Sequence, residues 1–101
     1  MKTLTLDKAM ELYEILGVHI PDVDDKDISA LEFIGKIVKN IKESGEHQRY
    51  VDAVMLMSGN TWEELKALNS VDVLEMFIDG LSTNKIVKLK MFCEEIGFNN
   101  A

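Results

Sequence analysis

The strongest constraint on the fold is a series of helix start and stop signals with no strand pattern between them. Thr61 is followed three positions later by Glu64, the spacing of a capping box, which satisfies free backbone N–H groups at a helix start. Polar capping residues also precede two further apolar stretches, and Gly97 follows the last of them. The second half of the chain therefore predicts three short helices in close succession: Trp62–Leu68, Val71–Gly80 and Asn84–Ile96.

The first half of the chain predicts helices from the same kinds of signal. Asp7 precedes a helical pattern that runs to about Leu16, and Gly17 suits the position just after a helix end. The second helix is expected to begin near Asp25–Asp27, because Asp side chains cap free N–H groups and favour the helix dipole. It is expected to end at Ser44-Gly45.

A third helix is predicted from about Glu46 to Ser58, and it is apolar on nearly all sides. A helix of this kind is normally central in a fold. Ala53–Met57 is therefore expected among the most buried segments. Three aromatic side chains at helical spacing are also expected in the core: Phe77, Phe92 and Phe98.

These patterns predict an all-α fold, a compact bundle of five to six short helices that forms one domain over residues 1–101. No segment shows a sustained alternation of apolar and polar residues, and Leu4–Leu6 is the one place where a short strand is considered. A hydrophobic fraction of 47% and a charged fraction of 29% are those of an ordinary globular protein rather than a disordered one.

The charge of the chain argues against two classes of partner. The formal net charge is −7, and both halves of the chain are acidic. Because nucleic acids and anionic membrane surfaces attract basic patches, neither is expected as a partner. The longest apolar run, Ala53–Met57, is far too short to span a membrane. The N-terminus has no apolar leader, and a lone Cys93 suits a reducing compartment, so a cytoplasmic location is expected.

No motif in the sequence indicates catalysis, a cofactor or a metal. Cys93 lies within an amphipathic helix, and neither His19 nor His47 is spaced to act as its base. The thiol is expected to be packed and inert, and the two histidines to lie at the surface or its boundary. The acidic run Asp22–Asp27 lacks the glycine and the final carboxylate of a calcium-binding loop. We therefore expect a protein that is not an enzyme.

The methionines and the tryptophan are the candidate partner-binding residues. Met is adaptable in shape and is common at binding surfaces, although each internal Met more often fills a gap in a core. Trp62 lies in the first turn of a short helix, where it either seals the edge of the core or anchors a partner. The residues proposed to contact a partner are Trp62, Met76 and Met91.

Four short stretches, distributed along the chain from Leu4 to Phe92, resemble one protein family. They are the opening Leu4–Ala9, the helical stretch Ile28–Val38, the capped segment Ser58–Leu65 and the closing helix Asn84–Phe92. In these stretches the chain resembles the small tail assembly chaperones of long-tailed phages and prophages of Gram-positive bacteria.

The resemblance implies a non-enzymatic role in tail morphogenesis. Proteins of this family bind the long helical tape measure protein and keep it soluble while the tail tube polymerises around it. The expected partner is therefore a tape measure protein, and a homo-oligomer is also possible. The family has no catalytic residues to transfer to this chain.

The alternative is a small phage-encoded regulatory or protein-interaction module. In a DNA-binding version, the helix Asn84–Ile96 would present Lys85, Lys88 and Lys90 to the bases. The same helix ends in Glu94-Glu95 within an acidic chain, which disfavours contact with DNA.

Overall fold

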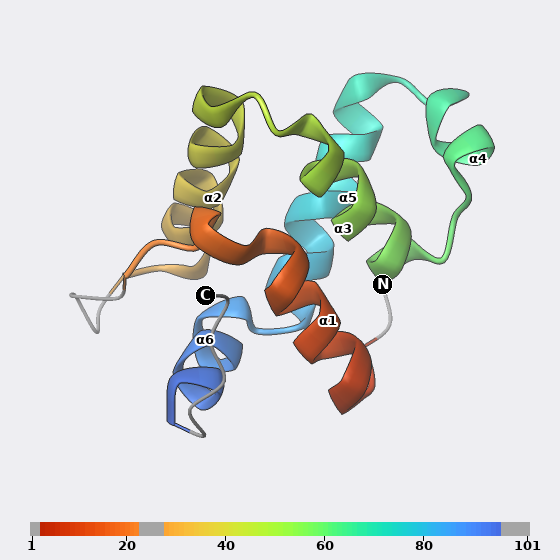
Figure 1. The fold of residues 1–101 in the computed structure, drawn as a ribbon. Coiled ribbons are helices and arrows are strands. Elements are labelled where there is room, and N and C mark those ends of the chain that lie inside the picture. The colour runs from red at the N-terminus through yellow and green to blue at the C-terminus, as the bar shows by residue number, and fades with distance from the viewer. Residues whose placement is uncertain (1–2, 23–27, 96–101) are drawn as a thin grey trace.

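A computed structural model describes residues 3–22 and 28–95, and in these ranges it contains helices and no strand. The elements are α1 (Leu6–Leu16), a short 3-10 helix η1 (Gly17–His19), α2 (Ala30–Ser44), α3 (His47–Ser58), α4 (Trp62–Lys66), α5 (Ser70–Thr83) and α6 (Ile86–Glu95) (Figure 1). The all-α prediction is confirmed. The strand considered at Leu4–Leu6 does not form, since Leu6 already belongs to α1.

Helix α3 lies at the centre of the arrangement. Helices α1 and α5 both pack extensively against it, and α2 packs on both α3 and α5 (Figure 1). Helix α6 contacts α1 and α2, whereas α4 packs on α3. Leu4 ties the beginning of the chain to the end of α5, because its N–H donates to the Asn84 Oδ1 atom at 2.8 Å.

The helix starts show which capping signals the chain uses. The capping box is confirmed: the Glu64 N–H donates to Thr61 Oγ1 at 3.2 Å, and the Thr61 N–H donates to Glu64 Oε1 at 3.0 Å. The predicted start of the second helix near residues 25–27 is wrong. Ser29 caps α2 by accepting from the Glu32 N–H at 3.1 Å. A serine directly before the apolar run therefore fixes the start, and residues 25–27 lie outside the described ranges.

The central position of α3 follows from its apolar side chains. Ala53 and Val54 are fully buried and Met57 is nearly so, as predicted for this segment. Met55 and Leu56 are only partly buried, because α1 and α5 do not enclose the helix on every side. The core is continuous and takes side chains from each of the six described α-helices, including Leu65 of α4.

The predicted aromatic core is confirmed for one of its three members. Phe77 is fully buried, and its ring meets the Tyr50 ring edge to face at a centroid distance of 4.8 Å. Phe92 is 41% exposed, so that prediction is wrong. Helix α6 directs Ile86 and Cys93 toward the core, whereas Phe92 lies on another side of the helix. Phe98 lies outside the described residues.

Two glycines are expected to respond oppositely to alanine. Gly17 has φ 50° and ψ −128°, and an added Cβ would lie 3.1 Å from Arg49 Nη1. Gly35 is helical, and a Cβ there would meet nothing within 4 Å. We expect Gly17→Ala to lower the free energy of unfolding by about 1–3 kcal/mol, and Gly35→Ala to raise it by about 0.5–1 kcal/mol. Urea unfolding of both variants measures this; a loss at Gly35 would contradict the open environment of that position.

Candidate functional site

An open groove lies between the C-terminal end of α3, one side of α5 and the beginning of α1. Its volume is about 1190 Å³. The apolar part of its lining comes from Leu56 and Met57 on α3 and from Met76 and Ile78 on α5. We call this depression the α3–α5 groove. Two of its four apolar lining residues are methionines, whose flexible side chains can adjust to differently shaped occupants.

The end of α3 shapes one wall of the groove. Gly59 takes a left-handed conformation with φ 75°, and its N–H donates to the Met55 carbonyl at 2.9 Å. The Asn60 N–H donates to Ser58 Oγ at 3.1 Å, which holds the turn after the helix. The Asn60 side-chain amide lies 4.0 Å from the Met76 sulfur. The chain thus leaves α3 abruptly at the end of the groove, with the turn held against α5.

The rim of the groove is acidic along α5. Asp72, Glu75 and Asp79 line it, and α5 contains no basic residue. Among the described residues, Asp72 and Glu75 form no ion pair. On the other side, Lys8 of α1 is the one basic side chain of the lining. An apolar floor beside an acidic rim suits an apolar segment that carries basic residues along one edge.

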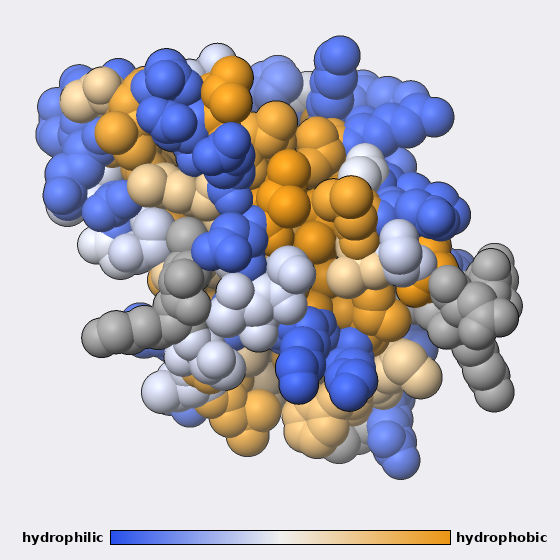
Figure 2. All heavy atoms as spheres, turned by 180° about the vertical axis from the view of Figure 1, so that it is seen from behind, coloured by the Kyte–Doolittle hydropathy of each residue, from blue (hydrophilic) through white to orange (hydrophobic). Residues whose placement is uncertain are grey.

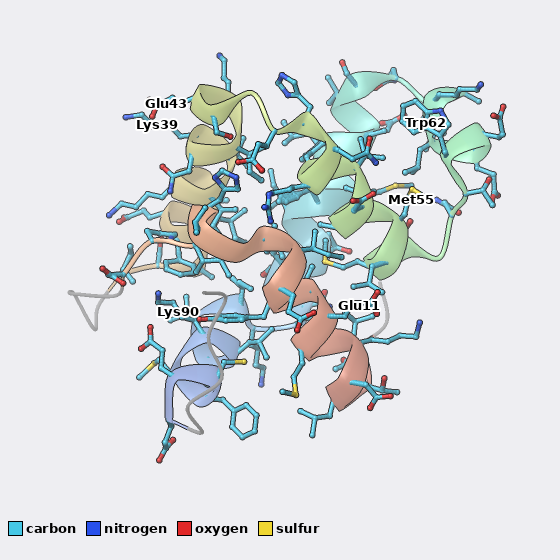
Figure 3. All side chains as sticks on the ribbon, viewed as in Figure 1. Glu11, Lys39, Glu43, Met55, Trp62 and Lys90 are labelled. Atoms are coloured by element: carbon cyan, nitrogen blue, oxygen red, sulfur yellow. The ribbon has the colours of Figure 1, made fainter. Side chains whose placement is uncertain are left out.

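The three proposed partner-binding residues do not form one surface. Met76 lines the α3–α5 groove and is partly buried. Trp62 is about half exposed on α4, where Figure 3 shows it on the same side of the molecule as Met55 of α3. Met91 is about half exposed on α6, which packs on α1 and α2 rather than beside the groove. Of the three, the structure brings only Met76 to the groove.

Cys93 is a packed side chain, as expected from its place in an amphipathic helix. It is fully buried, and this burial raises the pKa of its thiol. A raised pKa leaves less of the nucleophilic thiolate at neutral pH. In the described part of the chain, no group of three His, Cys, Asp or Glu side chains is placed to hold a metal ion.

The prediction that both histidines lie at the surface or its boundary is wrong for His19. His47 is exposed, but His19 is 4% exposed and its Nε2 lies 3.3 Å from Glu46 Oε1. The reason is that η1 folds back against α2, where the Asn40 amide donates to the His19 carbonyl at 2.9 Å. The hydrogen-bond partner is 21 positions away, so local sequence gives no sign of this burial.

Lys90 is a buried cation that the sequence analysis did not single out. Its Nζ lies 3.0 Å from Glu94 Oε1 and 3.4 Å from Asp22 Oδ1. Burial lowers its pKa, but the hydrogen bond and charge of Glu94 outweigh this effect, and the net pKa is raised. Lys90 shares a helical line with Ile86 and Cys93, both buried, and that spacing could have indicated its position.

The chain was compared with protein-family models, curated proteins and solved structures, and none of them matches it. Within residues 3–22 and 28–95, no helix is both long enough and apolar enough to cross a membrane.

Proposed function

We propose that this chain is a non-enzymatic protein-binding module that acts as a tail assembly chaperone of a long-tailed phage or prophage. Its client would be the tape measure protein, held in solution in the bacterial cytoplasm. The observation that supports this most is the α3–α5 groove, with its apolar floor and the acidic rim of α5. An amphipathic helix binds such a groove by laying its apolar side chains on the floor.

The groove suits a helical client because its lining can adjust to apolar segments of different shapes. A long helical client presents many similar but non-identical apolar stretches, and a chaperone must accept several of them. Met76 supplies a flexible contact, and the partly buried Leu56 lies beside it, whereas Met57 is nearly enclosed by the core. The acidic rim adds attraction for Lys or Arg at the edge of the client helix without requiring one fixed sequence.

A co-expression experiment tests this proposal. A tape-measure fragment that is insoluble alone is expected to stay in the supernatant with the wild-type chain. The groove variant Met76→Gln with Leu56→Asn is expected to return most of the fragment to the pellet, because polar groups on the floor disfavour apolar contacts. Met91→Gln is the matched control, since it changes an exposed Met outside the groove and is expected to behave as wild type.

Circular dichroism of the purified variants establishes that their helices remain. Loss of solubilisation by folded groove variants supports the proposal. Equal solubilisation by wild type and groove variant would show that the client binds elsewhere. A fragment that stays insoluble with the wild-type chain, together with any frameshifted longer form, would refute the chaperone function.

The DNA-binding form of the alternative function is disfavoured by one observation. Lys90, one of three lysines on the segment that would have to read bases, is 5% exposed and paired with Glu94 and Asp22. A protein-interaction module with another helical client would use the same groove. The co-expression experiment separates the two, since only a tape-measure client gives solubilisation of that fragment.

A further inference from the structure

The acidic rim of the α3–α5 groove forms a single line along α5. Asp72, Glu75 and Asp79 are separated by three and then four positions, so their side chains leave α5 on the same side, and all three are exposed. Seven positions of an α-helix span about 10 Å. Helix α5 lies behind α3 in Figure 1, and the view from behind shows hydrophilic side chains directly beside a band of apolar ones (Figure 2). The groove thus presents carboxylates at helical spacing next to an apolar surface.

Apolar side chains flank the acidic rim on both sides. At about 100° per residue, Met76 and Ile78 fall on opposite sides of it, and both are partly buried in the groove lining. An occupant that lies along α5 therefore meets apolar side chains and carboxylates within the same turns. Such an occupant must itself carry both kinds of side chain, with its charged ones on the side that faces the acidic rim.

Most of the acidic rim does not stabilise α5 itself. Asp72 lies in the first turn, where a carboxylate favours the helix dipole, but Glu75 and Asp79 lie beyond that turn. Like charges three or four positions apart destabilise a helix, and α5 contains no basic residue that could offset them. A cationic group bound along this side of α5 would remove the repulsion.

The end of α3 adds negative potential to the same groove. The Asn60 N–H, which would continue the helical hydrogen bonds, donates instead to Ser58 Oγ at 3.1 Å. No described backbone N–H donates to the Leu56 or Met57 carbonyl, so both lack the donor that a longer helix would supply. These carbonyls point out of the end of α3, where Ser58, Gly59 and Asn60 line the groove. With the helix dipole, they make this end of the groove negative.

We infer that the α3–α5 groove selects helical segments that carry lysine or arginine side chains at intervals of three or four positions, beside a row of apolar side chains. The spacing matches the acidic rim, because a helix that lies along α5 repeats at the same pitch. Segments with acidic side chains at those positions are repelled by the acidic rim and by the end of α3. The inference rests on the proposed client-binding function and specifies which segments of a client the groove accepts.

Charge disfavours the other classes of occupant. A second copy of this chain carries the same net charge of −7, and nucleic acids and anionic membrane surfaces are also negative. An apolar helix without basic side chains would leave the carboxylates of the acidic rim without a partner. A cationic amphipathic helix is the occupant that complements both the apolar floor and the negative charge around it.

Designed peptides test the charge preference separately from any natural client. Three labelled peptides of about 20 residues share one set of Leu and Ala residues and carry Lys, Gln or Glu at the positions that would face the acidic rim. In fluorescence anisotropy with the full chain, the Lys peptide is expected to bind about tenfold more tightly than the Gln peptide, and the Glu peptide most weakly. Equal binding of the three peptides, or a chain that binds none of them, overturns the inference.

A charge-reversal variant tests whether the acidic rim causes the preference. Glu75→Lys is expected to weaken binding of the Lys peptide about tenfold and to strengthen binding of the Glu peptide. Glu14→Lys is the matched control, since it makes the same change in net charge at an exposed position of α1 outside the groove, and it is expected to change binding little. Equal effects of the two variants would reveal a long-range effect of net charge and overturn the inference.

The outcome for the client is distinguishable from the outcome for the peptides. If Met76→Gln with Leu56→Asn loses solubilisation of the tape-measure fragment while Glu75→Lys keeps the wild-type peptide preference, the groove binds its client without distinguishing charge, and only this inference fails. If the fragment stays insoluble with the wild-type chain while the Lys peptide binds as expected, the groove is selective for basic helices and the proposed client is wrong. Circular dichroism of Glu75→Lys establishes that its helices remain.

Discussion

Replacing Phe77 with alanine is expected to lower the free energy of unfolding by about 3–5 kcal/mol. Phe77 is fully buried on α5, and its ring meets Tyr50 of α3 at 4.8 Å with an interplanar angle of 71°. Removing the ring removes buried apolar area, leaves a cavity in the core and deletes this edge-to-face contact. Domains of this size have total stabilities of about 5–15 kcal/mol, so the variant would lose a large part of its stability.

The matched control for this prediction is Phe92→Ala. Phe92 is 41% exposed on α6, and the same chemical change there is expected to cost less than about 1 kcal/mol. Urea unfolding followed by circular dichroism measures both variants under identical conditions. Equal losses would contradict the burial difference between these two rings.

Replacing Arg49 with alanine is expected to cost about 1–3 kcal/mol. The Arg49 Nη1 donates to the Ile15 carbonyl at 2.8 Å, and its Nε donates to the Glu46 carboxylate. One side chain thus joins the beginning of α3 to the end of α1, at a carbonyl that is partly buried. Lys66→Ala is the control, because Lys66 forms only an exposed pair with Glu63 at 2.8 Å and should change stability little.

The same variant is expected to change the response to acid. The hydrogen bond from Arg49 is the largest cause that lowers the pKa of Glu46 from its ordinary value of 4.5. A carboxyl group with a lowered pKa in the folded state stabilises the fold above its ordinary pKa, and this stabilisation disappears as the pH falls through the lowered value. Unfolding measured between neutral pH and about pH 3 should therefore show a smaller acid loss in Arg49→Ala than in wild type. An identical pH dependence would contradict this role of the pair.

Local signals in the sequence predicted most of the helix ends. Thr61 and Glu64 form the expected capping box, and Gly45 and Gly59 end their helices in the left-handed conformation. These signals act within a few residues, so one segment of sequence contains all of the relevant chemistry. The start of α2 was mispredicted because several polar residues before it can cap a helix, and Ser29 is the one that accepts from Glu32.

The candidate site was less predictable because it is assembled from distant segments. The groove joins Lys8, the end of α3 and one side of α5, and no local pattern places these together. Met76 and Met91 were chosen by residue type, and Trp62 by its place in the first turn of a short helix, but only Met76 lines the groove. The burial of His19 likewise depends on Asn40 of α2. The sequence shows which side chains can pack or bind, but it does not show which of them become neighbours in the folded chain.

The hydrogen bond between Leu4 and Asn84 joins the beginning of the described chain to the end of α5. Lys8, a few residues further along, lines the groove across from the acidic residues of α5, whereas Leu4 and Asn84 do not line it. The distance between the two sides of the groove is therefore set partly by a contact outside it. A substitution at Asn84 would change the width of the groove while leaving every residue of its lining in place.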